Sequence, residues 1–86
     1  MILIGIEKCN LCEKVRFELF PIKYIKLTKN KSKSTPEILK VKKIINRLNK
    51  SKRFPVVLND DITKLVDTEY ILKNLDKRSI ANKLID

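Results

Sequence analysis

The chain contains two cysteines, Cys9 and Cys12, which are separated by two residues and follow a short apolar run over residues 2–6. A strand, then Cys-x-x-Cys, then a helical pattern is typical of sites of dithiol–disulfide exchange. The first amide groups of a helix lack helical acceptors and carry positive potential, so they stabilise a thiolate placed there. We therefore interpret Cys9 as the nucleophile and Cys12 as the thiol that resolves the mixed disulfide.

Charged residues beside this pair should tune the pKa of the Cys9 thiol. Lys8 directly precedes it and favours the thiolate, whereas Glu7 and Glu13 oppose it. Together with the start of the helix, these charges predict a Cys9 pKa below the ordinary thiol value.

Length and composition limit the class of protein. Eighty-six residues with 43% hydrophobic content predict one folded domain, residues 1–86. No apolar run approaches the ~20 residues that cross a bilayer, and the first residues lack the basic start of a signal peptide. We therefore expect a cytoplasmic protein with no membrane partner, in a reducing compartment where a permanent structural disulfide is not expected.

Strand and helix patterns place the cysteines at the junction of two elements. Residues 2–6 predict a buried strand in which Gly5, the only glycine, marks a close backbone approach or a bulge. Residues 10–20 predict a helix that ends at Pro21, and its buried stripe is expected to include Phe17 and Phe20.

The remaining patterns complete an α/β order. In chain order they predict a strand over residues 22–27, a loop over 28–35, and a helix from 36 to 48 capped by residue 35. A strand over 54–58, a turn over 59–61 and a strand over 62–66 follow. The chain then continues with a helix capped at 67–68 that carries Ile71, Leu72 and Leu75, and with a short tail helix over 79–85 packed by residues 80, 84 and 85. The order βαβ-α-ββ-α is that of a minimal thioredoxin fold, with a four-stranded mixed sheet flanked by helices.

Four groups of residues resemble the glutaredoxin family, particularly the small phage-type glutaredoxins and glutaredoxin-like thioredoxins. They are Cys9-Asn10-Leu11-Cys12 after the first strand, Lys8 before it, Arg53-Phe54-Pro55 at the third strand, and Asp67-Thr68 before a late helix. Their order and spacing cover about residues 1–78.

The resemblance implies a binding site around the dithiol. It implies that Pro55 is cis and faces the cysteines, so that the backbone of Phe54 pairs with an extended substrate. It implies that Asp67 and Thr68 hold the γ-glutamyl end of glutathione, while Lys8 meets its glycyl carboxylate. Arg47 is a weaker candidate for that carboxylate.

The chain departs from the glutaredoxin pattern at three places. Asn10-Leu11 replaces the usual Pro-Tyr, Leu65-Val66 stands where a Gly-Gly pair is usual, and Arg53-Phe54 replaces Thr-Val. These departures concern glutathione binding more than the fold or the dithiol. We expect glutathione as the reductant and keep thioredoxin reductase-type reduction as an alternative.

The predicted function is a cytoplasmic thiol–disulfide oxidoreductase in electron transport, acting as a monomer with no permanently bound cofactor. The net charge of +10 suits an acidic target such as ribonucleotide reductase. Zinc is the first alternative, but two cysteines without histidine would require a dimer or carboxylate ligands. Basic nucleic-acid binding is the second, although aromatic and arginine content are low. A redox-inactive interaction module of the same fold is the third.

Overall fold

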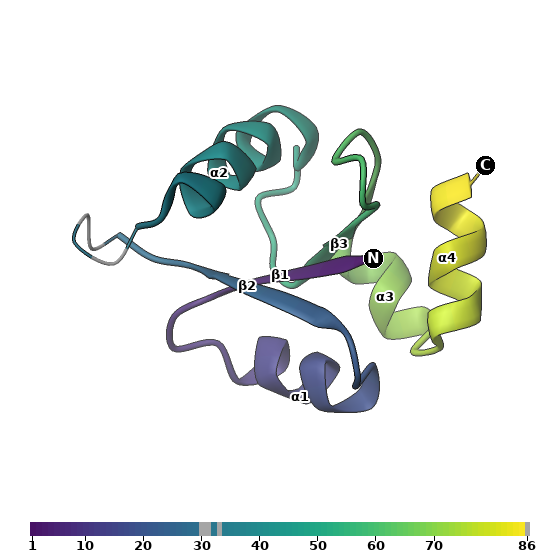
Figure 1. Ribbon diagram of the computed structural model, residues 1–86. Coiled ribbons are helices and arrows are strands. Elements are labelled where there is room, and N and C mark those ends of the chain that lie inside the picture. Colours follow the sequence, from purple (N-terminus) through teal and green to yellow (C-terminus); the bar gives the residue numbers. More distant parts are fainter. Residues whose placement is uncertain (30–31, 33, 86) are drawn as a thin grey trace.

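Four strands and four helices make up the described part of the chain, residues 1–29, 32 and 34–85 of the computed structural model (Figure 1). In chain order they are β1 (Ile2–Ile6), α1 (Asn10–Glu18), β2 (Lys23–Leu27), α2 (Pro36–Leu48), β3 (Val56–Leu58), β4 (Leu65–Val66), α3 (Thr68–Lys73) and α4 (Lys77–Ile85). Residues 30, 31 and 33, and with them part of the predicted loop, lie outside the described residues.

The strands form one mixed sheet in the order β2-β1-β3-β4. β1 pairs with β2 in parallel, and β3 pairs with both β1 and β4 in antiparallel fashion. Helices flank this sheet, which confirms the predicted α/β class and is compatible with a minimal thioredoxin-like fold. The central strand β1 leads directly to the Cys-x-x-Cys segment, so the sheet holds the first cysteine in place.

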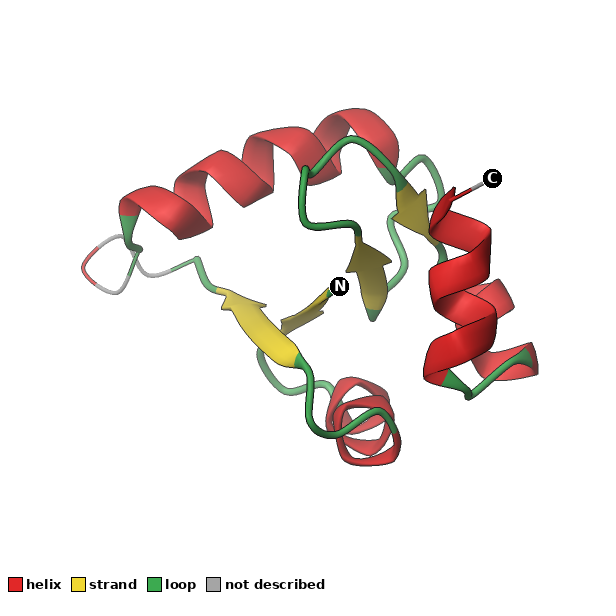
Figure 2. Cartoon of the chain, turned by 45° about the vertical axis from the view of Figure 1, so that its right-hand side comes forward, coloured by secondary structure: helices red, strands yellow, loops and turns green. Residues whose placement is uncertain are grey.

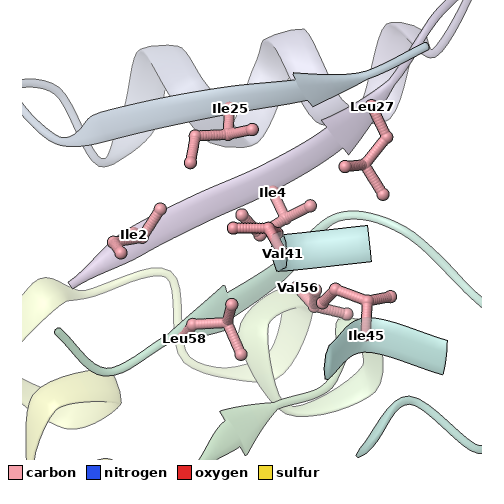
Figure 3. Packing of buried hydrophobic residues seen from close by; sticks show 8 residues of the cluster. All are labelled: Ile2, Ile4, Ile25, Leu27, Val41, Ile45, Val56 and Leu58. Atoms are coloured by element: carbon pink, nitrogen blue, oxygen red, sulfur yellow. The ribbon is translucent and has the colours of Figure 1, made fainter. Parts of the chain in front are cut away.

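Alternation along the strands produces a hydrophobic core on each face of the sheet. α2 covers one face and α1 lies against the opposite face, as Figures 1 and 2 show together. On the α2 side, Ile2 and Ile4 of β1 pack with Val41 and Ile45 of the helix (Figure 3). On the other side, Leu3 packs with Val15 and Leu19, near the end of α1. Hydrophobic side chains are therefore packed against β1 on both faces of the sheet.

Side-chain caps begin three of the helices. The Cys9 sulfur, the Thr35 hydroxyl and the Asp67 carboxylate each accept a backbone N–H from the first turn of their helix. Pro36 occupies the start of α2, where its missing N–H is not needed. The predicted starts of all three helices are thus confirmed, although Cys9 occupies a position that Ser, Thr, Asp or Asn usually fills.

The prediction that Phe17 and Phe20 widen the buried stripe of α1 is wrong. Their side chains are 81% and 75% exposed. Successive helical residues turn by about 100°, so Phe17 lies about 200° from Val15, on the opposite face. α1 ends at Glu18, two residues before Phe20, and the amide of its C-cap residue Leu19 bonds back to the helix.

Several predicted elements are shorter or shifted. β2 begins at residue 23, β3 begins at Val56 rather than at residue 54, and β4 spans only two residues. Before β4, the Asn59 side chain accepts the N–H groups of Thr63 and Lys64, which holds those residues in a turn. Antiparallel pairing of β3 with β4 is confirmed.

The two C-terminal helices also differ in detail from the prediction. α4 begins at residue 77, two residues early, and buries Ile80 and Leu84. Ile85, predicted to pack, is 76% exposed, because it falls on the outer side of the last turn. Leu72 and Leu75 are also exposed, so Ile71 anchors α3. None of the helices in the described part of the chain has the length and apolar character that a membrane span needs.

Candidate functional site

The Cys-x-x-Cys segment lies at the junction of β1 and α1. Between these elements Lys8 adopts a left-handed backbone conformation with φ 56°, which turns the chain from the strand into the helix. Cys9 then serves as the N-cap of α1, and Cys12 lies in its first turn. The two residues form a disulfide, with their Cα atoms 5.3 Å apart.

The two sulfurs have different environments. Cys9 is partly exposed, and its Sγ accepts the backbone N–H of Cys12 at 3.1 Å. Cys12 is fully buried against the sheet. A donated amide at the start of a helix stabilises negative charge on the Cys9 sulfur once the disulfide is opened. The Cys9 sulfur, the outer of the two, is therefore accessible to a substrate and has a hydrogen-bond donor. The Cys12 sulfur, the inner one, is out of reach of large molecules.

Two cations pair with Glu13, one of the two carboxylates that flank the cysteines in the sequence. Glu13 was expected to oppose ionisation of Cys9. Its carboxylate pairs with the Arg16 guanidinium at 3.7 Å and with the Lys26 amine at 3.6 Å. Two cations within 4 Å compensate much of that negative charge. The electrostatic balance at α1 is therefore more favourable to a thiolate than the sequence alone suggested.

Pro55 follows a cis peptide bond with Phe54, as the resemblance implied. In the antiparallel register of β1 with β3, Ile4 lies opposite Val56. The start of β3 therefore lies beside the end of β1 that leads to the cysteines. The buried hydroxyl of Thr68 donates to the Pro55 carbonyl at 2.7 Å, which ties this segment to the first turn of α3.

Three of the predicted binding residues line two different pockets. Lys8 and Phe54 line a pocket of about 530 Å³ beside the β1–α1 junction, together with residues from the end of β2 and from α2. Asp67 lines a different pocket, of about 390 Å³, with Tyr70 and Lys83.

Three residues predicted to contact glutathione, Asp67, Thr68 and the weaker candidate Arg47, have other roles or positions in the structure. The Asp67 carboxylate caps α3 by accepting the Tyr70 N–H at 2.9 Å. The Thr68 hydroxyl is engaged with the Pro55 carbonyl. Arg47 is exposed and lines neither of the two pockets. Their contact with glutathione stays a prediction.

Sequence reasoning missed one residue beside the dithiol, Tyr24 of β2. A Cβ built on Gly5 would lie 3.0 Å from the Cβ of Cys12 and against the Tyr24 hydroxyl. The expected close approach at Gly5 is thus confirmed, and the unbroken register of β1 with β2 shows no bulge there. Alternation in β2 carries a signal for this placement, since Ile25 and Leu27 face α2 and Tyr24 must face α1.

In residues 1–29, 32 and 34–85, no group of three or more His, Cys, Asp or Glu side chains is arranged to hold a metal ion. Comparisons with protein-family models, with curated proteins and with solved structures find no match. The function must therefore be argued from the geometry around the disulfide.

Proposed function

We propose that this protein is a thiol–disulfide oxidoreductase of glutaredoxin type that reduces protein or glutathione mixed disulfides in the cytoplasm. The observation that carries the proposal is the asymmetry of the pair. Cys9 is partly exposed and accepts a helix amide, whereas Cys12 is buried directly behind it. An attacking thiolate must reach its substrate, and a resolving thiol needs to reach only the first sulfur.

The reaction is a pair of exchanges. In the reduced protein the Cys9 thiolate attacks a substrate disulfide, forms a mixed disulfide and releases the first substrate thiolate. Cys12, as its thiolate, then attacks the Cys9 sulfur, restores the Cys9–Cys12 disulfide and releases the second substrate thiolate. Two electrons pass to the substrate, and solvent supplies its two protons. Two glutathione thiols, becoming one glutathione disulfide, return the electrons to the protein.

The pocket beside Lys8 suits an anionic substrate. Lys8, Lys29 and Lys42 line it together with Phe54, and the one carboxylate among the described residues of its lining is that of Glu7. Glutathione carries two carboxylates, so the excess of cations in this pocket complements their charge. A net charge of +10 favours an acidic protein target, for which ribonucleotide reductase is an example. The protein acts as a monomer, with glutathione as its electron donor.

The test compares single-cysteine variants in a coupled assay with a glutathione mixed disulfide as substrate. Glutathione with glutathione reductase is the electron donor in one arm, and thioredoxin reductase is the donor in the other. Cys9→Ser should abolish turnover, because no exposed thiolate remains. Cys12→Ser should retain part of it with glutathione, since a second glutathione can resolve the mixed disulfide.

Two results would contradict the proposal. Turnover by Cys9→Ser that equals that of the unaltered protein would show that Cys9 is not the nucleophile. A protein that stays inactive with both donors, although its disulfide opens with a strong chemical reductant, would be an interaction module without this activity. Faster turnover with thioredoxin reductase than with glutathione would support the dithiol–disulfide exchange but would show that thioredoxin reductase, and not glutathione, is the electron donor.

A further inference from the structure

The Tyr24 hydroxyl is an unsatisfied polar group in the interior. Its oxygen is buried and has no hydrogen-bond partner in the described part of the chain, where it is the one buried side-chain polar atom in that state. Buried hydroxyls nearly always have a partner, and each exception calls for an explanation. The ring belongs to β2 and lies on the α1 side of the sheet.

The position of this hydroxyl points to the resolving cysteine. The phenol oxygen and the Cβ of Cys12 both lie within 3.0 Å of the point that a Gly5 Cβ would occupy. The phenol oxygen and the Cys12 Cβ therefore lie at most twice 3.0 Å apart. The absence of a side chain at Gly5 allows this close approach, because even a Cβ there would clash with both the hydroxyl and the cysteine.

The surroundings of the ring keep the hydroxyl protonated. Burial raises the pKa of Tyr24, the Glu13 carboxylate raises it further, and the Arg16 guanidinium, 4.6 Å from the ring centroid, partly opposes this. Lys26 is the other cation beside Glu13 on this face of the sheet. A phenol held in its neutral form is a hydrogen-bond donor.

We propose that Tyr24 is a catalytic residue that donates a hydrogen bond to the Cys12 thiolate released when the Cys9–Cys12 disulfide is opened. In the disulfide, the hydroxyl makes no hydrogen bond to the Cys12 sulfur. Once the disulfide bond is broken, rotation about Cα–Cβ moves the sulfur around a carbon atom that lies beside Tyr24. Cys12 is fully buried, so a thiolate formed there needs a donor from the protein.

The step rests on the proposed function, with a low-molecular-weight thiol as the reductant. Its thiolate attacks the Cys9 sulfur and forms a mixed disulfide, and the bonding pair of the broken S–S bond leaves on Cys12. Tyr24 stabilises this charge without losing its proton. A second thiolate then attacks the mixed disulfide at the sulfur of the first thiol and releases the Cys9 thiolate. The products are one low-molecular-weight disulfide and the reduced pair, which takes up protons from solvent.

Tyr24→Phe tests the donor because it removes only the hydroxyl. The first readout is the equilibrium between dithiol and disulfide in glutathione redox buffers. We expect the variant to favour the disulfide about tenfold more than the unaltered protein, which corresponds to a potential about 30 mV lower. Tyr70→Phe is the matched control, since it removes the hydroxyl of the other tyrosine, which contacts the Ser79 carbonyl.

The second readout does not depend on turnover. In a Cys9→Ser background, the ultraviolet absorbance of the Cys12 thiolate is followed against pH, with and without Tyr24→Phe. Loss of the hydroxyl should shift this titration to higher pH, with about a tenfold smaller thiolate fraction at a given pH. A purely structural role for Tyr24 would change stability and leave this titration unchanged.

The outcomes separate this inference from the proposed function. Equal redox equilibria and equal Cys12 titrations with and without the Tyr24 hydroxyl would overturn the inference, even if the protein reduces mixed disulfides. The same shift in Tyr70→Phe would overturn it as well. A shift specific to Tyr24→Phe supports it, and this holds even where the coupled assay detects no turnover.

Discussion

Replacement of Gly5 by alanine should destabilise the protein through contact with Tyr24 and Cys12. Gly5 is buried and its φ lies outside the left-handed region, so an alanine could adopt its backbone conformation. The obstacle is space. The new Cβ would lie 3.0 Å from both the Cys12 Cβ and the Tyr24 Cε1, and closer still to the Tyr24 oxygen. Carbon atoms pack best at about 3.5–4.0 Å, so the ring or α1 must shift.

The magnitude follows from two opposing effects. Overpacking a well-filled interior costs about 1–3 kcal/mol. Replacing a glycine inside a strand recovers about 0.5–1 kcal/mol of backbone entropy. The clash dominates, because one of its neighbours is a helix Cβ that cannot rotate away. We expect a net loss of about 1–2 kcal/mol, which in a domain of this size lowers the melting temperature by roughly 4–16 °C.

A double-mutant cycle identifies the source of the loss. The free energy of unfolding of the oxidised protein is measured in urea for Gly5→Ala, for Tyr24→Phe and for both together. Because the phenol oxygen is the nearest atom to the new Cβ, Tyr24→Phe should recover about half of the loss. An unchanged stability in Gly5→Ala, or an equal loss in both backgrounds, would refute the proposed contact.

Three further predictions concern other contacts. Thr68→Val should reduce the free energy of unfolding by about 1–3 kcal/mol in urea, because the Pro55 carbonyl loses its buried donor; a change below about 0.5 kcal/mol would contradict this. In difference spectra against Tyr24→Phe, the Tyr24 phenol should titrate with a pKa above its ordinary value of 10.0. Because the pKa is raised in the folded protein, the phenol should stabilise the fold fully at pH values below 10.0. This stabilisation should be lost as the pH rises through the pKa of the folded state. Phe17→Ser should change the free energy of unfolding by less than about 0.5 kcal/mol, because Phe17 is exposed, whereas Leu19→Ala should reduce it by about 2–5 kcal/mol, because Leu19 is buried. Comparable losses in the two variants would show that Phe17 is buried, as the sequence predicted.

Local signals in the sequence were sufficient for the fold and for the starts of α1, α2 and α3. The apolar run over residues 2–6 and the caps at Thr35 and Asp67 are short-range features, and they lie where the patterns indicated. The cis bond before Pro55 came from the resemblance rather than from any local pattern. The apolar run and the two caps could be predicted because the physical cause of each lies within a few residues of the strand or helix that it defines.

The errors arose where tertiary contacts decide. Hydrophobicity alone predicted that Phe17 and Phe20 are buried, but α1 offers the sheet only the stripe through Val15 and Leu19. The resemblance grouped Asp67 with Lys8 around one ligand, whereas in the structure these two residues line different pockets. Their contact with glutathione stays a prediction.

The relation between Tyr24 and Cys12 could not be predicted because it depends on three elements at once. β2 supplies the hydroxyl, β1 supplies the space at Gly5, and α1 supplies the sulfur. No spacing in the chain connects these residues, since only the parallel register of β1 with β2 brings Tyr24 alongside Leu3 and one pleat from Gly5.

Burial makes the two cysteines chemically unequal, and this asymmetry limits what any function of the site can be. A substrate disulfide can reach Cys9 but not Cys12, so exchange must begin and end at the outer sulfur. The inner sulfur becomes charged each time the pair is opened, in an environment from which water is largely excluded. Without a donor that charge would be strongly disfavoured, and the disulfide would resist reduction by ordinary thiols. The Tyr24 hydroxyl is buried and has no partner among the described residues in the disulfide form. In the proposed cycle it supplies this donor and gains its hydrogen bond when the pair is reduced.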